Sequence, residues 1–202
     1  GYARWAATYD NDLPHNPLAQ ADWTAVQRLL PDLQGLRVLD AACGTGRYAR
    51  LAASAGGLVS AVDRSADMLS RARQLVPDIP WTRTDVLHLP FPDHCFDIVL
   101  YALAAVHQPT VELEELARVL RPGGALILSD LHPYGQVQGW GCTFRGGTIQ
   151  TFPHTLGDYY GAFRRAGLTL DGQEVELAPD DLPAAFAGKP LAMALRGRKW
   201  PS

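Results

Sequence analysis

A short apolar segment, an acidic residue and a glycine turn, together spanning Leu36 to Arg47, constrain the fold of this chain more than any other feature. The apolar residues predict a strand that ends at Asp40, and a helix is expected to begin near Gly46. Gly44 and Gly46 have no Cβ, so the backbone there can adopt positive φ and approach a ligand closely. The first turn of the helix presents N–H groups that have no partner within the helix. This pattern predicts a ligand site at the end of the first strand.

The glycine spacing fits two classes of cofactor. Gly44-x-Gly46-x-x-Ala49 matches the dinucleotide fingerprint, and Asp63 lies about 20 residues further on, where that fingerprint has a ribose-binding acid. Asp40 favours a different ligand, because a carboxylate directly before the glycines repels a pyrophosphate but attracts an ammonium group. S-adenosylmethionine carries such a group. A nicotinamide or flavin enzyme stays open as the alternative.

Four segments of the chain, taken in order, resemble the class I S-adenosylmethionine-dependent methyltransferases, specifically the small-molecule group that includes the ubiquinone and menaquinone C-methyltransferases. The resemblance covers nearly the whole chain, and the four segments together are specific. Ala42 departs from the pattern, since the family usually has a glycine there, and its methyl group should crowd the amino-acid end of the cofactor. The matching segments are residues 38–46, 59–63, 85–91 and 118–124.

The resemblance implies which residues hold the cofactor. Asp40 and the glycine turn would bind the methionine end, Asp63 the two ribose hydroxyls, and Asp85 the exocyclic amine of the adenine. The N-terminal segment around Tyr9 would fold over the cofactor. The full set of implied cofactor-binding residues is Tyr9, Asp40, Ala42, Gly44, Gly46, Asp63, Arg64, Met68, Asp85, Val86 and Ala102.

Methyl transfer from a sulfonium is an in-line displacement, in which an enzyme mainly holds two groups in line at about 3 Å. A general base is needed only if the acceptor must lose a proton, and His is the usual choice near neutral pH. His107 follows the fourth expected strand, His132 follows the fifth, and His154 precedes a helix. His107 is the first choice, although a loop histidine bonded to the backbone is an equally good interpretation of each.

Aromatic residues occur in the segments that are expected near the acceptor. They predict an apolar or aromatic acceptor, although aromatic residues are also ordinary core residues. The predicted substrate-binding residues are Tyr2, Trp5, Trp140, Phe144 and Tyr160.

Alternating strands and helices predict an α/β fold with a doubly wound, mostly parallel, Rossmann-like sheet of seven strands, the last of them antiparallel. A small hairpin insertion at residues 134–153 follows the fifth strand and should cover the substrate pocket, with a surface decoration as the alternative. Residues 1–202 should form one domain, in which residues 1–31 form N-terminal lid helices. The expected strands are residues 36–40, 58–62, 81–85, 96–101, 125–129, 168–177 and 191–196.

Capping residues predict where three helices begin. Asn16 and Ser65 each precede a helical pattern, and Thr155 with Asp158 forms a capping box. The helix that follows the box is expected to bury Tyr160.

A further helix is expected at residues 113–121, between the fourth and fifth strands. Glu114 and Arg118 are spaced to form an i,i+4 ion pair on it. The run Pro122-Gly123-Gly124 should end this helix before the fifth strand begins.

The net charge of −3 and the scattered basic residues argue against nucleic acid as a partner and favour a small molecule. The three cysteines are odd in number and widely spaced, so we expect no disulfide framework and a cytoplasmic location. No apolar run approaches the ~20 residues that span a bilayer, and no signal-peptide pattern opens the chain. Motifs for a serine hydrolase, a phosphate-binding loop or a zinc site are absent from the sequence, so no metal is expected.

The sequence therefore predicts an S-adenosylmethionine-dependent methyltransferase that acts on a small, apolar or aromatic metabolite. An NAD(P)-dependent oxidoreductase is the enzyme alternative. Two further possibilities are a cofactor-binding protein of this fold without methylation activity, and an enzyme in which the sulfonium supplies only charge.

Overall fold

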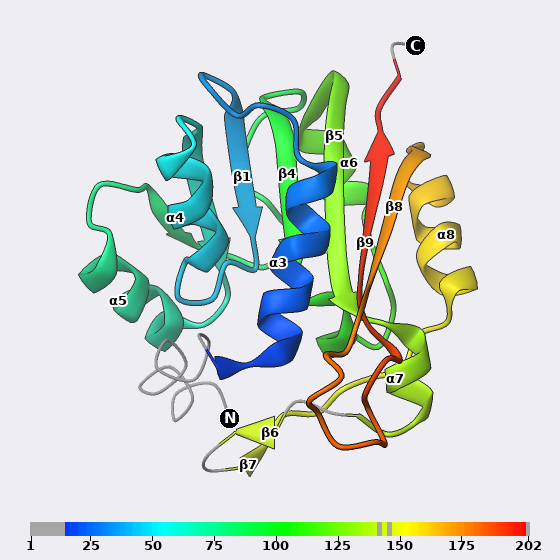
Figure 1. Ribbon diagram of the computed structural model, residues 1–202. Coiled ribbons are helices and arrows are strands. Elements are labelled where there is room, and N and C mark those ends of the chain that lie inside the picture. The colour runs from blue at the N-terminus through cyan, green and yellow to red at the C-terminus, as the bar shows by residue number, and fades with distance from the viewer. Residues whose placement is uncertain (1–14, 141–142, 145–146, 201–202) are drawn as a thin grey trace.

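The computed structural model describes residues 15–140, 143–144 and 147–200. Seven strands form one sheet in the order β3-β2-β1-β4-β5-β9-β8 (Figure 1). β1 to β5 are parallel, and β9 is antiparallel to both of its neighbours. The predicted doubly wound sheet with an antiparallel last strand is thus confirmed. The strands are β1 (Arg37–Ala41), β2 (Leu58–Asp63), β3 (Trp81–Arg83), β4 (Phe96–Ala102), β5 (Leu120–Leu131), β8 (Thr169–Leu177) and β9 (Pro190–Arg198).

Helices cover both faces of this sheet (Figure 1). Side chains from α3, α4 and α5 pack on one face, and side chains from α6 and α8 pack on the other. Two short helices, one after β4 and one after β5, lie at the carboxyl ends of these strands. The helices are α3 (Pro17–Leu29), α4 (Arg47–Ser54), α5 (Ala66–Leu75), α6 (Glu114–Val119), α7 (Pro133–Val137) and α8 (Leu156–Arg165), with a short 3₁₀ helix η2 (Ala105–His107).

Alternate residues of the central strands pack into two separate hydrophobic cores, one on each face of the sheet. In β1, Val38 belongs to the core under α3 and α4, whereas Leu39 belongs to the core under α6 and α8. In β4, Ile98 and Val99 divide in the same way. Strands buried on both faces are continuous apolar runs, which is why these segments were recognisable in the sequence.

The capping predictions are confirmed. The Asn16 side chain accepts a hydrogen bond from the Ala19 N–H at 3.3 Å, and Ser65 accepts one from Met68 at 3.3 Å. Thr155 and Asp158 form the expected reciprocal capping box.

The boundary between α6 and β5 differs from the prediction. β5 begins at Leu120, so the Pro122–Gly124 run lies within the strand assignment instead of ahead of it. The reason is tertiary pairing: Gly123 N–H donates to Lys199 O at 2.6 Å, and Lys199 N–H donates to Gly124 O at 3.0 Å. These bonds extend the sheet through a sequence that would otherwise form a turn.

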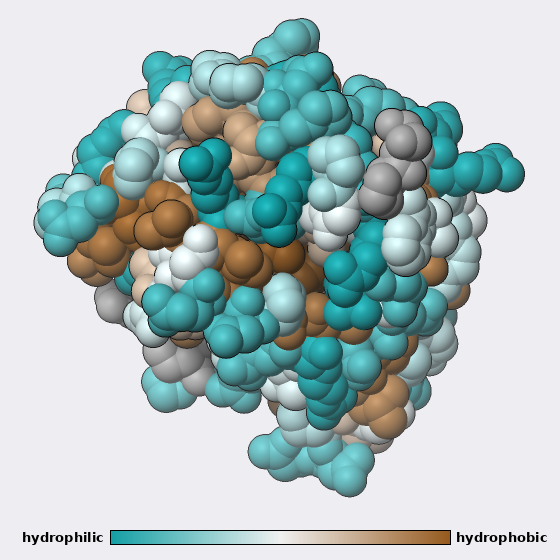
Figure 2. Space-filling view, turned by 90° about the horizontal axis from the view of Figure 1, so that it is seen from above, coloured by the Kyte–Doolittle hydropathy of each residue, from teal (hydrophilic) through white to brown (hydrophobic). Residues whose placement is uncertain are grey.

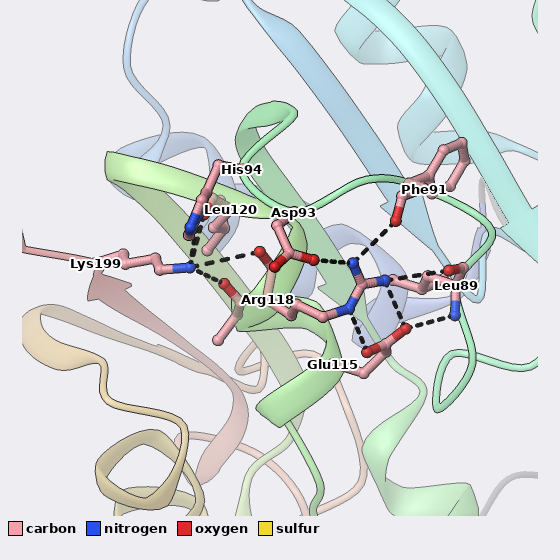
Figure 3. A network of polar contacts seen from close by, with 9 residues as sticks. Leu89, Phe91, Asp93, His94, Glu115, Arg118, Leu120 and Lys199 are labelled. Atoms are coloured by element: carbon pink, nitrogen blue, oxygen red, sulfur yellow. Dashed lines mark hydrogen bonds and ion pairs between the residues drawn. The ribbon is translucent and has the colours of Figure 1, made fainter.

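The predicted ion pair between Glu114 and Arg118 is wrong. Arg118 instead binds Glu115 with two N–O distances of 2.8 Å and Asp93 with one of 2.6 Å (Figure 3). The same guanidinium donates to the carbonyl oxygens of Leu89 and Phe91. Arg118 therefore fastens the loop before β4 to α6.

Lys199 fastens the end of β9 to the same region (Figure 3). Its ammonium donates to Ala117 O at 2.7 Å and Leu120 O at 2.9 Å, and its Nζ lies 3.1 Å from His94 Nδ1. Figure 2 looks onto this end of the sheet, where the parallel strands begin, and shows apolar atoms interrupted by many hydrophilic side chains. At this end Arg118 thus binds acidic side chains and carbonyl oxygens, whereas Lys199 binds carbonyl oxygens and lies beside His94.

The described part of the expected N-terminal lid is a core helix. α3 packs across β5, β8 and β9, and Arg196 Nη1 donates to Leu29 O at 2.9 Å. Residues 1–14 lie outside the described residues.

The insertion after β5 contains the predicted hairpin, but its strands are shorter, since β6 (Thr143–Phe144) and β7 (Gly147–Thr148) each have two residues. The short helix α7 precedes it and was not predicted. Figure 1 shows the hairpin at the carboxyl end of the parallel strands. Among the residues that the structure describes, none of the helices is long and apolar enough to cross a bilayer.

Candidate functional site

The glycine turn after β1 has the predicted left-handed conformation. Gly44 has φ 56° and Gly46 has φ 81°. Cys43 N–H donates to Val62 O at 2.9 Å, which keeps the turn attached to β2. Gly46 directly precedes α4 and offers no side chain to cap it, so the N–H groups of the first turn of α4 face the carboxyl edge of the sheet.

Gly46 is required for a second reason, which the sequence did not reveal. A Cβ on this residue would lie 2.3 Å from Cη2 of Trp81. The indole N–H of Trp81 donates to Val76 O at 2.9 Å, so the ring cannot easily move away. Trp81 therefore occupies the space that a side chain at position 46 would need.

Asp40 is 2% exposed at the end of β1. Its Oδ2 accepts a hydrogen bond from the Ala49 N–H of α4 at 2.8 Å. Burial raises the pKa of Asp40 to about 8, and the nearby charge of Asp63 also raises it, whereas the Ala49 N–H lowers it. A buried carboxylate with so high a pKa would become ionised next to a cationic ligand.

Asp63 lies at the end of β2, on the same edge, and is 9% exposed. Its Oδ2 accepts from Gly44 N–H at 2.8 Å and its Oδ1 from Ser65 N–H at 2.7 Å. Burial raises the pKa of Asp63, and these two N–H groups counteract that effect. Asp63 thus holds the glycine turn against α5, and its oxygens keep acceptor capacity for a further donor.

Ala42 has a φ of 56°, in the left-handed region. This is the position where the sequence lacks the expected glycine, and it is strained because an L side chain disfavours that conformation.

The other implied cofactor residues surround the same edge. Met68 and Val86 are buried, and Asp85 is half-buried with its Oδ1 accepting from Leu87 N–H at 3.1 Å. Arg64 is exposed beside Asp63, and Ala102 is half-buried at the end of β4. Tyr9 lies outside the described residues.

A buried polar cluster beside the glycine turn was missed by the sequence analysis. Asp22 of α3 is fully buried and accepts a hydrogen bond from the Tyr48 hydroxyl of α4. Arg47 Nη2 donates to Ala19 O at 2.7 Å. Three buried polar atoms in this cluster make no hydrogen bond of normal geometry among the described residues: Asp22 Oδ1, Arg47 Nη1 and Ser129 Oγ. Of these, the Ser129 hydroxyl is near enough to Asp22 to lower the pKa of Asp22. Such orphaned atoms are rare in folded proteins and often mark a site for water or a ligand.

Two sequence signals could have found this cluster. Asp22 interrupts the apolar stripe of α3, where helical spacing predicts another core residue. Arg47 is a cation in the first turn of α4, where the helix dipole disfavours positive charge.

The three candidate histidines have different surroundings. His107 Nδ1 lies 3.1 Å from Gln150 O, which fixes the proton on Nδ1 and makes Nε2 the basic nitrogen. Burial lowers the pKa of His107 and so favours this neutral form. His132 Nδ1 accepts from Tyr134 N–H at 3.1 Å, and His154 Nε2 lies 3.1 Å and 3.0 Å from two carbonyl oxygens. His154 is 4% exposed, as expected for a histidine that binds the backbone.

The predicted acceptor residues are only partly brought together. Trp140 packs edge-on against Tyr134, and its ring lies tilted against Phe186 at 4.8 Å between ring centroids. The expectation that Tyr160 is buried is wrong: it is 37% exposed on α8, and its hydroxyl donates to Gln173. Its neighbour Tyr159 is buried instead, because the helix register turns that residue toward the sheet. The backbone of Phe144 lies in β6, whereas Tyr2 and Trp5 lie outside the described residues.

Tyr159 belongs to a buried hydrogen-bond network that links β5 to the elements beyond it. Its hydroxyl donates to Asp130 Oδ2 at 3.2 Å and accepts from Gln136 Nε2 at 3.2 Å. The same Asp130 oxygen accepts from Val106 N–H at 2.7 Å, and Gln136 Oε1 accepts from His154 N–H at 2.6 Å. Burial raises the pKa of Asp130 to about 7. The network positions η2, and with it His107.

Comparisons with known proteins agree with this geometry. A family model described as "Methyltransferase domain" matches residues 38–124. The chain is 37% identical over 135 residues to a malonyl-[acyl-carrier protein] O-methyltransferase of Pectobacterium atrosepticum, covering 64% of this chain and 51% of the relative. It is 36% identical over 140 residues to a demethylmenaquinone methyltransferase of Renibacterium salmoninarum, covering 63% and 59%. The chain thus spans about half the length of these curated relatives.

A solved structure supports the same fold. The S-adenosylmethionine-dependent methyltransferase of Mesorhizobium loti superposes with a TM-score of 0.73 at 24% identity, covering 91% of this chain and all of that one. At that identity the likeness bears on the fold alone.

Proposed function

Because the chain belongs to the class I S-adenosylmethionine-dependent methyltransferases, we propose that it transfers a methyl group from that cofactor to a small organic acceptor. The observation that carries this proposal is the pair of buried carboxylates, Asp40 and Asp63, on either side of a left-handed glycine turn. Asp40 disfavours a dinucleotide pyrophosphate at this turn, because a carboxylate directly before the glycines repels it.

The orphaned polar atoms fit the amino-acid end of this cofactor. The methionine moiety carries a carboxylate and an ammonium group, and the cluster offers a guanidinium nitrogen, Arg47 Nη1, that no other described residue binds. We assign the carboxylate to Arg47 and the start of α4, and the ammonium to Asp40. Asp22 would then balance the charge of Arg47 from the opposite side, since that guanidinium lowers the pKa of Asp22.

The ribose and adenine are assigned further along the same edge. Asp63 would accept the ribose hydroxyls while keeping its bonds to Gly44 and Ser65. Asp85 follows β3, the edge strand next to β2. It would accept a hydrogen bond from the adenine amine, with Met68 and Val86 as apolar neighbours.

The bound cofactor supplies an electrophilic methyl group on a sulfonium. The protein would align the acceptor with it and exclude water. Where the acceptor must lose a proton, we assign that proton to Nε2 of His107, because the Gln150 carbonyl holds the other ring proton on Nδ1. His132 and His154 are less suited, since His132 uses Nδ1 as an acceptor and His154 donates from Nε2 to the backbone.

Binding of S-adenosylhomocysteine, measured by isothermal titration calorimetry, tests the cofactor assignment. Asp63→Asn should weaken binding at least tenfold, because a charged acceptor of two hydroxyl groups becomes a neutral one. Asp67→Asn, on the exposed first turn of α5, is the matched control and should bind as the unchanged protein does. A parallel titration with NADH tests the oxidoreductase alternative. Tight NADH binding without S-adenosylhomocysteine binding would overturn the proposal.

The acceptor class is proposed from the surroundings of the β4 and β5 ends. Val106, Trp140 and Phe186 line or adjoin this region. Two relatives are named as a malonyl-[acyl-carrier protein] O-methyltransferase and a demethylmenaquinone methyltransferase. We therefore propose a largely apolar acceptor. Methyl transfer from labelled cofactor to a panel of phenols, quinols and acyl esters measures this directly.

A further inference from the structure

The segment that leaves the hairpin, residues 149–154, belongs to no helix or strand. We call it the exit segment. Without helix or sheet bonds of its own, such a segment is placed by the partners that its polar groups find elsewhere. Three alternate residues supply those bonds, and all of them reach η2 or the residue that follows it: Gln150, Phe152 and His154.

Two of these bonds involve consecutive residues of η2. Phe152 N–H donates to Val106 O at 2.7 Å. The carbonyl oxygen of Gln150 lies 3.1 Å from Nδ1 of His107 and accepts its proton. The backbone and the candidate base of η2 are therefore both bonded to the exit segment.

The side chain of His154 bonds to η2 at two points. Its Nε2 lies 3.1 Å from Ala105 O and 3.0 Å from Gln108 O. A carbonyl oxygen only accepts hydrogen bonds, so Nε2 carries a proton that the two carbonyls share. Ala105 comes two residues before His107 and Gln108 directly after it. His154 thus bonds the backbone on both sides of His107.

His154 is itself fixed in place. It is 4% exposed, its backbone N–H donates to Gln136 Oε1 at 2.6 Å, and its ring packs edge-on against Tyr159 with 5.6 Å between centroids. On the side of β5, Asp130 Oδ2 accepts from Val106 N–H at 2.7 Å. η2 is therefore held between β5 and an exit segment whose last residue cannot easily move.

The basic nitrogen of His107 depends on this arrangement. The Gln150 carbonyl keeps the proton on Nδ1 only while η2 and the exit segment stay in register, because a hydrogen bond weakens steeply when its distance or angle changes. The remaining bonds between the two segments maintain that register.

We propose that His154 is a positioning residue for the methyl-transfer reaction: it bonds the backbone on both sides of His107 and so keeps the His107 ring on Gln150, with Nε2 as the basic nitrogen. The inference rests on the proposed function, in which Nε2 of His107 takes the proton of the acceptor. His154 does not take that proton itself, since it is buried and its Nε2 donates to the backbone.

The experiment measures the ¹⁵N chemical shifts of the histidine rings in the full chain, with and without S-adenosylhomocysteine. The shift difference between Nδ1 and Nε2 reports which nitrogen carries the proton, and His107→Gln identifies the signals of His107. In the unchanged protein we expect the proton of His107 on Nδ1 and a proton of His154 on Nε2.

Two substitutions of His154 separate its hydrogen bonds from its packing. His154→Phe keeps a ring beside Tyr159 but removes the donor, so both tautomers of His107 should form and the shift difference should fall to about half or less. His154→Gln loses the ring but keeps an N–H donor at a similar reach, so it should retain the shift difference. His88→Phe, at an exposed histidine, is the control and should change nothing.

A folded His154→Phe protein with an unchanged shift difference at His107 would overturn the proposal, as would a loss in His154→Gln as large as that in His154→Phe. If His154→Phe does not fold, His154→Asn replaces it, because its shorter side chain does not reach the two carbonyls. A His154 ring protonated on Nδ1 alone in the unchanged protein would overturn the proposal without any variant.

Calorimetric binding of S-adenosylhomocysteine to each protein keeps this inference separate from the proposed function. Its absence in the unchanged protein would refute the proposed function, whatever the state of His107. Binding that is retained in His154→Phe, together with an unchanged His107 tautomer, would refute only the role of His154. We expect binding to be retained and the tautomer to change.

Discussion

Replacing Asp22 with Asn should stabilise the protein at neutral pH. Asp22 is fully buried in the apolar stripe of α3, and burial raises its pKa from 3.8 to about 6, although the Tyr48 hydroxyl lowers it. Asn keeps a side-chain oxygen for the Tyr48 hydroxyl but never carries a charge. The substitution therefore removes the cost of ionising a carboxyl group inside the protein.

The size of the stabilisation and the pH range in which it appears follow from the pKa difference of Asp22 between the folded protein and the unfolded chain. Because the pKa is higher in the folded protein than in the unfolded chain, the stabilising effect of the protonated form is complete below pH 3.8 and is lost as pH rises through about 6. A difference of about two pKa units corresponds to about 3 kcal/mol. Relative to the unchanged protein, Asp22→Asn should thus gain about 3 kcal/mol in unfolding free energy between about pH 4 and pH 7.

Urea unfolding followed by circular dichroism measures this difference at several pH values. Comparing the variant with the unchanged protein at each pH cancels the contributions of Asp40 and Asp63, which titrate in both proteins. The contribution of Asp130 changes with the substitution, because the charge of Asp22 raises the pKa of Asp130. Asp78→Asn, on an exposed residue, controls for the loss of one negative charge. A difference between variant and unchanged protein that stays constant from about pH 4 to pH 7 would refute the reasoning.

Three further results are expected. Ala42→Gly should raise the unfolding free energy by about 1 kcal/mol in urea titrations, because φ is 56° at this residue and glycine adopts that conformation without strain; a loss of stability would contradict this. Tyr159→Phe should cost about 1–3 kcal/mol in the same assay, because a buried carboxylate loses a donor, whereas Tyr160→Phe, which loses one exposed bond, should change stability by less than about 0.5 kcal/mol. S-adenosylhomocysteine binding at about pH 7 should release a proton from Asp40, whose pKa is about 8 before the ligand binds, and calorimetry in buffers of different ionisation enthalpy detects it; Asp40→Asn should abolish the release.

The fold could be predicted because its signals are local. β1, β2 and β4 are buried on both faces and are therefore apolar throughout, and Asn16, Ser65 and Thr155 cap helices through bonds that span three residues. The predictions fail where contacts between residues distant in the sequence determine the local structure. The pairing of Gly123 and Gly124 with Lys199 extends β5, although the local sequence indicates a turn.

In the candidate site, too, the residues with local sequence signals were predicted and those placed by long-range contacts were missed. Asp40 and Asp63 were predicted because strand ends and a glycine turn are visible in the sequence. Trp81 was missed as a neighbour of Gly46, since 35 positions separate the two and only the sheet brings them together. Tyr160 was preferred to Tyr159 because helical spacing has an uncertainty of about one residue at the edges of an apolar stripe.

The two ends of the sheet differ in how their charges are compensated, and this difference bears on function. At the end where the parallel strands begin, Arg118 pairs with Glu115 and Asp93, and the pKa of Glu115 is lowered chiefly by that hydrogen bond. At the carboxyl end, burial raises the pKa of Asp22, Asp40, Asp63 and Asp130 alike. Burial makes the ionisation of these carboxylates costly and so lowers the unfolding free energy of the protein without ligand. A cationic ligand stabilises the ionised carboxylates, so its binding raises the unfolding free energy again.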